Sequence, residues 1–174
     1  MRTQDRDAEF SAYVAAHRVR MVRAALLLTG GAYAEAEDLV QTVLVRLYLR
    51  WGRVSRVEDP VGYGMRALTN VFLDERRRAH RRREVVSDHD ADGPRPGDQM
   101  AEHDVRATVF AALAALPPRQ RAVVVLRHFL DHDVAGTADA LGITEGTVKS
   151  QNAKALTRLR ELLGTDIDYE EVGP

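Results

Sequence analysis

The segment that most constrains this chain runs from Leu141 to Gln151 and reads LGITEGTVKSQ. Gly142 suits the left-handed residue that ends a helix, and Thr144 suits the N-cap of the helix that follows. This spacing predicts the turn and second helix of a helix-turn-helix, the unit that places a helix in the major groove of DNA. An ordinary capped surface helix is the alternative interpretation of the same residues.

The second helix of this unit has an apolar side and a polar side. Its core-facing positions recur at helical spacing: Val148, Asn152, Ala155, Leu156, Leu159 and Leu163. The cap and the remaining polar positions form the face expected to contact DNA: Thr144, Thr147, Lys149, Ser150, Gln151 and Lys154. Gln151 can offer a donor and an acceptor to an adenine edge, whereas Lys149 and Lys154 offer only positive charge.

Composition limits the class of protein. The chain has 174 residues and no cysteine, which excludes a disulfide framework and a thiolate metal site and fits a reducing compartment. The first residues run into no apolar signal core, and no apolar run approaches the length that spans a membrane. We therefore expect a soluble, cytoplasmic protein without membrane insertion.

The net charge of -1 conceals a strong segregation of charge. Residues 1–83 are basic, residues 84–104 are acidic, and residues 105–174 are nearly balanced. The acidic block is rich in Pro and Gly and has almost nothing to bury, so it predicts a flexible linker. This pattern would arise if the basic block binds an anionic partner and the acidic linker imitates the charge of that partner. It would arise equally well if both blocks are solvated surfaces whose charges cancel in the sum.

The linker separates two small helical domains, 1–83 and 105–164, and an acidic tail follows at 165–174. In the first domain, apolar stripes predict three helices, which contain Phe10 to Leu28, Leu39 to Tyr48, and Met65, Leu68 and Phe72. In the second domain they predict four: Val105 to Leu116, Arg119 to Leu130, Val134 to Leu141, and the helix behind Thr144. The expected fold class is therefore all-α.

The third helix of the first domain carries a polar face and a basic end. Arg66, Asn70, Asp74 and Arg77 step by three or four residues and share the side opposite the apolar stripe. The helix ends in a run of arginines from Arg76 to Arg83, which repel one another unless a polyanion is near. Arg and Asn side chains there can reach bases or phosphates. A solvated face with an Asp-to-Arg pair is the alternative.

These residues also carry a family resemblance. The sequence AEDLVQ at 36–41, Trp51, the Pro60 loop, and Asn70 before the arginines resemble the sigma-2 domain of bacterial sigma factors. The sequence LPPRQRAVVVLR at 116–127, with LG at 141–142 and GTVKS at 146–150, resembles their sigma-4 domain. The two matches, separated by a linker too short for a sigma-3 domain, are typical of the extracytoplasmic-function group. An Arg- and Ala-heavy composition fits an actinobacterial subgroup.

The resemblance implies a protein that binds core RNA polymerase and promoter DNA and opens the DNA, with no active site and no cofactor of its own. Polymerase contacts are implied for Asp38, Gln41 and Thr42, which would meet the clamp coiled coil of the largest subunit. Contacts to the unwound minus-ten strand are implied for the loop Gly52 to Asp59 and the third helix, through Arg53, Arg56, Arg66, Asn70, Arg76 and Arg77. The helix behind Thr144 would read the minus-thirty-five element, and the acidic linker would follow the channel of nascent RNA. An anti-sigma factor is a further implied partner, which the sequence does not name.

This sequence departs from the family pattern at two positions. Thr42 stands where an acidic residue is common, and Gln151 stands where a basic residue is frequent. These departures bear on individual contacts and leave the assignment intact.

Other chemistries fit the sequence poorly. His128 and His132 lie one helical turn apart, but no further ligand cluster accompanies them, so we expect no metal. Glu35, Glu37 and Asp38 stand at a helix start, where they favour the macrodipole. No phosphate loop or nucleophile motif is present, so we expect no enzyme. The rival function is a polymerase-independent helix-turn-helix regulator, and a helical adaptor that binds only protein would leave the arginines and the 144–151 segment unexplained.

Overall fold

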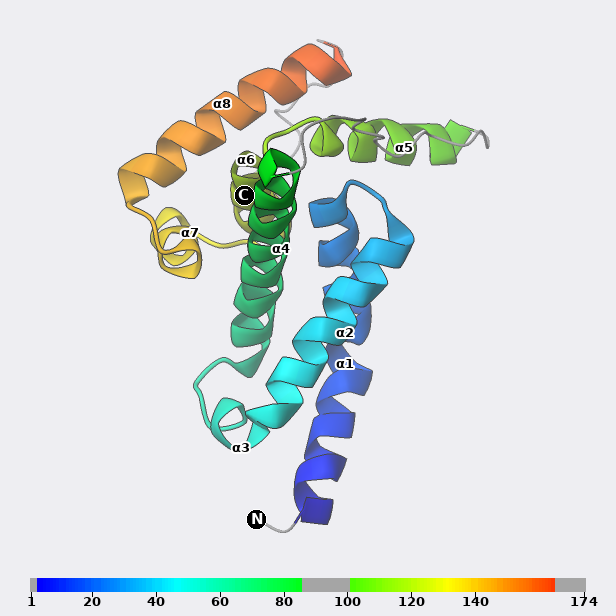
Figure 1. The fold of residues 1–174 in the computed structure, drawn as a ribbon, viewed down its shortest axis with the longest axis vertical. Coiled ribbons are helices and arrows are strands. Elements are labelled where there is room, and N and C mark those ends of the chain that lie inside the picture. The colour runs from blue at the N-terminus through cyan, green and yellow to red at the C-terminus, as the bar shows by residue number, and fades with distance from the viewer. Residues whose placement is uncertain (1–2, 86–100, 165–174) are drawn as a thin grey trace. The chain divides into compact units, whose positions relative to one another are not determined.

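The computed structural model describes residues 3–85 and 101–164, and within these ranges all regular structure is helical (Figure 1). The chain divides into two compact units, Met1–Ala91 and Asp92–Pro174. These findings confirm the predicted all-α class with two helical domains. The centre of the predicted linker and the acidic tail lie outside the described residues. No described helix is long and apolar enough to cross a membrane.

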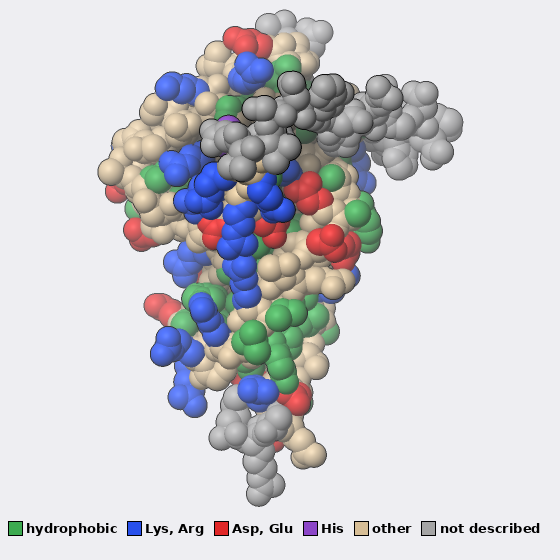
Figure 2. All heavy atoms as spheres, viewed as in Figure 1, with side chains coloured by type: hydrophobic (Ala, Val, Ile, Leu, Met, Phe, Trp, Pro, Cys, Tyr) green, Lys and Arg blue, Asp and Glu red, His purple; other side chains and the backbone are tan. Residues whose placement is uncertain are grey.

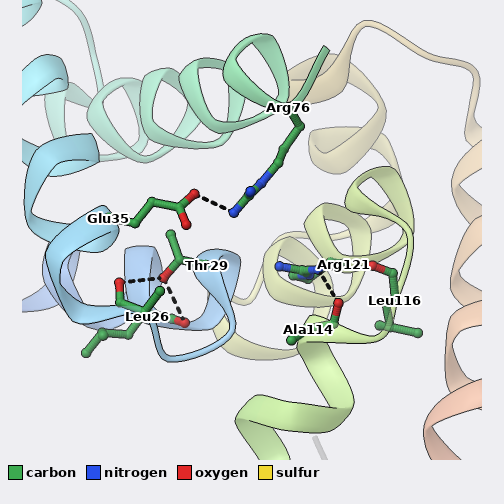
Figure 3. A network of polar contacts seen from close by, with 8 residues as sticks. Leu26, Thr29, Glu35, Arg76, Ala114, Leu116 and Arg121 are labelled. Carbon is green, nitrogen blue, oxygen red and sulfur yellow. Dashed lines mark hydrogen bonds and ion pairs between the residues drawn. The ribbon is translucent and has the colours of Figure 1, made fainter. Parts of the chain in front are cut away.

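The first unit contains the helices α1 (Thr3–Thr29), α2 (Tyr33–Leu49), α3 (Trp51–Val54) and α4 (Pro60–Val85). The turn between α1 and α2 uses Gly30 and Gly31, whose φ angles of 67° and 89° are left-handed. The Thr29 hydroxyl holds this turn, because it lies within hydrogen-bond distance of the carbonyls of Leu26 and Ala32, at 3.4 and 3.3 Å (Figure 3). The hairpin of α1 and α2 therefore follows from local sequence.

The core of the first unit is formed where α1, α2 and α4 pack together. The predicted apolar stripes supply it with Met21, Leu28, Leu39, Val43, Leu47, Met65, Leu68 and Phe72, all of which are buried. An aromatic cluster of Phe10, Tyr13, Tyr48 and Trp51 closes the end of this core that lies beside α3. The sequence pattern thus identified the buried faces of all three long helices correctly.

The short helix α3 was not expected, because the segment from Gly52 to Asp59 was predicted to be a loop. Trp51 and Val54 are both buried, and they anchor this single turn on the core. The segment then ends at Asp59, whose Oδ1 accepts a hydrogen bond of 2.8 Å from the Gly62 backbone N–H. With Pro60 at the first helical position, Asp59 provides a standard start for α4.

The second unit contains α5 (Ala101–Ala114), α6 (Pro118–Val124), the π-helical turn η1 (Val125–Phe129), α7 (Val134–Leu141) and α8 (Glu145–Leu163). Together with α4, which ends at Val85, α5 extends into the range predicted as linker. The helix-turn-helix is confirmed: Gly142 has a φ of 61°, and the Thr144 hydroxyl accepts a hydrogen bond of 3.2 Å from the Thr147 N–H. The expected burial of Val105 is wrong, because its side chain is exposed.

The predicted helix from Arg119 to Leu130 differs from the observed one at its end. Its last turn is a π-turn, in which the Leu130 N–H donates to the Val125 carbonyl at 3.0 Å. Asp131 follows with a φ of 55°, and the Arg127 guanidinium donates to the His132 carbonyl at 2.7 Å. The wider turn keeps Leu130 buried while the chain reverses toward α7.

A buried arginine joins α5 to α6. Pro118 has no N–H, so the Ala114 carbonyl lacks its usual helical donor, whereas the Leu113 carbonyl, opposite Pro117, accepts from the Leu116 N–H at 3.1 Å instead. The Arg121 guanidinium, only 6% exposed as a residue, donates instead to the carbonyls of Ala114 and Leu116, at 2.6 and 3.1 Å (Figure 3). This side chain therefore replaces the backbone bond that Pro118 removes and ties the Leu116 carbonyl to α6 as well.

Candidate nucleic-acid interface

The packing of α8 fixes which of its sides can face DNA. Val148 and Ala155 are completely buried and Leu159 nearly so, which defines the core-facing side. At about 100° per residue, Ser150, Ala153 and Thr157 fall on the opposite side. All three are exposed, so this side is the centre of the surface that a groove of DNA would meet.

The residues predicted to read DNA occupy different parts of that surface. Lys149, Ser150 and Lys154 are exposed, and they flank or form the centre of the face. Gln151 is half-buried and lies on the flank of the core-facing side. Sequence reasoning passed over Ala153 because it is small and apolar, although its helical position alone places it between Lys149 and Ser150.

The threonine hydroxyls at the start of α8 interact with each other and with the backbone of the helix. The Thr144 and Thr147 hydroxyls lie 2.9 Å apart, in addition to the bond from the Thr147 N–H. Both side chains therefore help to set the start of α8. Their predicted contact to DNA remains a prediction.

A small core holds the two helices of the helix-turn-helix at a fixed angle. Val123 of α6, Ala138 of α7 and Val148 of α8 are buried together, and Val134, Leu141 and Ile143 pack against them. At the start of α7, Asp133 Oδ1 accepts a hydrogen bond of 2.6 Å from the Gly136 N–H. The recognition helix α8 thus packs on a buried core that it shares with α6 and α7.

His128 and His132, the two histidines considered as metal ligands, form hydrogen bonds within the protein. His128 Nε2 and Asn152 Oδ1 lie 3.0 Å apart, so a hydrogen bond joins η1 to α8. His132 accepts the bond from Arg127 through its carbonyl. Among the described residues, no three His, Cys, Asp or Glu side chains are grouped as a metal would require.

The outer face of α4 carries the basic side chains predicted for the minus-ten strand. Arg66, Asn70 and Arg77 are exposed, and Figure 2 shows Lys and Arg side chains gathered along α4. Arg77 also forms an ion pair with Asp74, the pair that the alternative interpretation anticipated. An exposed pair of this kind contributes little to stability and leaves the guanidinium available to a polyanion.

Arg76, which was predicted to contact DNA, has a different environment from Arg77. Its guanidinium pairs with Glu35 at the start of α2 (Figure 3). It also lies 5.2 Å from the centre of the Phe72 ring. Burial, and after it the charge of Glu35, raise the pKa of the neighbouring Glu75 above its usual value. Arg76 therefore links α4 to α2, a role that only the folded chain reveals.

The exposed face of α2 runs the length of the helix. Asp38 and Gln41 are exposed and Thr42 is half-buried. Val45 and Leu49 continue the same side and are 59% and 74% exposed, which sequence reasoning did not single out. Glu37, at the start of the same helix, forms an ion pair with Arg18 of α1.

The connection between α2 and α4 presents two further arginines. Arg53 lies on α3 and Arg56 follows it, and both are exposed. The buried Trp51 and Val54 of α3 hold this part of the segment on the core. The arginines of the connection and those of α4 belong to one unit and are carried by adjoining elements.

Two family models match the chain, each within one unit. Residues 13–82 match sigma-70 region 2, and residues 106–159 match sigma-70 region 4. The chain is 37% identical over 161 residues to the RNA polymerase sigma-E factor of Streptomyces coelicolor, covering 92% of this chain and 89% of that protein. It is 36% identical over 149 residues to the ECF RNA polymerase sigma factor SigL of Mycobacterium tuberculosis, covering 83% and 82%.

A solved structure shares the fold. The sigma factor RpoE of Bartonella quintana, crystallised with the anti-sigma factor NepR, superposes with a TM-score of 0.69 at 23% identity. The match covers 91% of this chain and 99% of that one. With both regions present in order and relatives matched over most of their length, the chain belongs to the sigma-70 family of RNA polymerase sigma factors, in the extracytoplasmic-function group.

Proposed function

We propose that this chain binds core RNA polymerase and directs it to promoters, where it recognises two DNA elements and helps to open the duplex. The observation that carries the proposal is the presence, in one chain, of an arginine-lined sigma-70 region 2 unit and a sigma-70 region 4 helix-turn-helix with an exposed face. The protein would act in the cytoplasm, where polymerase and promoters meet. It would contribute no catalytic residue, because the polymerase performs the chemistry.

The polymerase and the two promoter elements are assigned to different surfaces in this proposal. Asp38, Gln41 and Thr42 on α2 would contact the polymerase. The outer face of α4, with the connection before it, would hold the unwound minus-ten strand through Arg53, Arg56, Arg66, Asn70 and Arg77. The face of α8 would read the minus-thirty-five element through Lys149, Ser150, Ala153 and Lys154, with Thr144, Thr147 and Gln151 at its edge. Arg76 would act on DNA only if it left Glu35.

An anti-sigma factor is a further proposed partner. Its support is that the structural relative from Bartonella quintana was solved with such a protein. The exposed apolar side chains of Val45 and Leu49 on α2 would also be buried by a protein partner.

Reconstitution tests the proposal directly. The purified chain is mixed with core RNA polymerase, and transcripts from a promoter library are sequenced. Promoter-specific starts that require the chain support a sigma factor. Sequence-specific binding of duplex DNA by the free chain, without any effect on the polymerase, would instead indicate an independent regulator.

Replacing Asp38 and Gln41 together by Ala is expected to weaken binding to core polymerase by about tenfold, because few residues dominate an interface. Both side chains are exposed, so the fold should be unaffected. The matched control replaces Gln4 and Glu9 of α1, an exposed amide and an exposed carboxylate, by Ala. Equal affinities of the two double variants in a fluorescence titration would remove α2 from the proposed polymerase interface.

Replacing Arg66 or Asn70 by Ala is expected to reduce open complexes by about 5–10-fold at saturating polymerase, because contacts to unwound bases and phosphates are lost. Closed-complex binding to the duplex should change far less. Permanganate reactivity of unpaired thymines measures opening, and Arg20→Ala on α1 provides the exposed-arginine control. Parental footprints for both α4 variants would show that this face does not hold the minus-ten strand.

A further inference from the structure

Tyr13 of α1 contacts both ends of the segment from Trp51 to Pro60. Its ring lies 4.9 Å from the Trp51 ring, with an angle of 56° between the planes. Its hydroxyl donates to the Pro60 carbonyl at 3.3 Å. Figure 1 shows α3 between the end of α2 and the start of α4, beside the N-terminal half of α1. One buried side chain therefore spans the segment that carries the exposed Arg53 and Arg56.

The Tyr13 hydroxyl occupies space that the absence of a side chain at Gly64 leaves open. A Cβ at Gly64 would overlap this oxygen, so the glycine leaves the room that the hydroxyl occupies. Burial, and second the negative charge of Asp59, raise the pKa of Tyr13 above its usual value. A tyrosine hydroxyl is protonated at neutral pH, and this shift only extends the pH range in which it can donate to Pro60.

The segment needs such an anchor because it cannot hold its own shape. A helix of four residues, such as α3, is far below the length at which a helix is stable alone. Backbone hydrogen bonds within the stretch from Arg50 to Val57 shape the turn, and the packing of Trp51, Val54 and Tyr13 holds it on the core. If that packing loosens, binding of DNA must also order the segment, and the entropy lost in this ordering lowers the affinity.

We propose that Tyr13 is a positioning residue for promoter opening, which holds the 51–60 segment in the shape that meets the unwound strand. This inference rests on the function proposed above for that segment. It assigns a role in DNA opening to a residue that lies under the segment and does not itself touch DNA.

Tyr13→Phe tests the inference, because it removes only the hydroxyl. We expect about three- to tenfold fewer open complexes by permanganate reactivity, with core-polymerase affinity and closed complexes within about twofold of the parent. The matched control is Thr29→Val, which removes another buried hydroxyl from α1, about 24 Å along the helix from Tyr13. This control should lose similar stability and open promoters normally. Equal open-complex yields for the two variants, or parental opening by Tyr13→Phe, would overturn the inference.

A double-variant cycle with Gly64 separates positioning from general destabilisation. Gly64→Ala alone should impair opening, because its Cβ displaces the hydroxyl. In the Tyr13→Phe chain the nearest remaining neighbours of the new Cβ are Leu47 Cδ1 and the ring carbon Cζ, at ordinary contact distances of 3.6 and 3.7 Å. Gly64→Ala should therefore add no further opening defect there, while raising the melting temperature through better helix propensity. Additive defects would contradict a shared role in holding Pro60.

The outcomes distinguish the inference from the function on which it rests. If Arg66→Ala and Asn70→Ala impair opening while Tyr13→Phe does not, the proposed function stands and the inference fails. If none of these variants changes opening, the minus-ten assignment fails and the inference fails with it. An opening defect in Tyr13→Phe and in the two α4 variants, absent from Thr29→Val, supports both.

Discussion

Arg121→Met is expected to unfold the second unit at a markedly lower temperature while the first unit remains unchanged. The substitution keeps an apolar stem but leaves the carbonyls of Ala114 and Leu116 without their donor. Lost bonds to a charged donor and unpaired buried acceptors together cost about 2–4 kcal/mol of unfolding free energy. For a unit of this size, the melting temperature should fall by about 10–20 °C.

The position of the only tryptophan makes this measurement specific. Trp51 is buried in the first unit, so its fluorescence reports that unit alone, whereas far-ultraviolet circular dichroism reports both. Arg121→Met should separate the two transitions in the full-length chain. Arg119→Met is the matched control, because Arg119 is exposed two residues away. Identical melting of both variants would show that the carbonyls of Ala114 and Leu116 find other donors.

The parts of this fold that sequence predicted are those that short-range chemistry decides. Gly142 and Thr144 end one helix and start the next through their own conformation and hydroxyl, and the bounds of α7 agree with the prediction. The buried faces of α1, α2 and α4 follow from helical spacing. Such features depend only on residues a few positions apart.

The parts that sequence missed depend on contacts between distant residues. Arg76 and Arg77 are neighbours in one basic run, but helix rotation turns the first toward Glu35 and the second outward. α3 forms because Trp51 finds an aromatic cluster, two rings of which lie on α1. No local pattern contains these partners. The π-turn is different, because its partners are five positions apart and the apolar spacing alone does not separate it from a continued α-helix.

The candidate DNA face of α8 likewise contains residues that the helical pattern identified and one that it did not. Lys149, Ser150 and Lys154 were assigned to the DNA face from a helical pattern, and packing leaves them exposed. Gln151 was chosen for its chemistry, and its half-buried position makes it a weaker candidate for a base contact. Ala153 was not predicted to face DNA, because the prediction considered the chemistry of each side chain before its position on the helix.

Ala153→Glu is expected to reduce binding of the polymerase holoenzyme to the minus-thirty-five element by about 100-fold or more, because a carboxylate facing phosphates and base edges costs several kcal/mol. Glu at this position also pairs with Lys149 one turn earlier and so removes one of the flanking cations. Ala153→Gln is the matched control, since it has the same shape without the charge. It should cost far less than the glutamate.

The choice of DNA separates a local effect from a general one. On a promoter whose upstream element is scrambled, the Glu and Gln variants should bind alike, because that duplex no longer engages α8 specifically. Affinity for core polymerase should be parental in both, since Ala153 lies in the other unit from α2. If Ala153→Glu retained the parental preference for the intact upstream element, the side of α8 opposite Val148 would not face DNA, and the flank that carries Gln151 would become the better candidate.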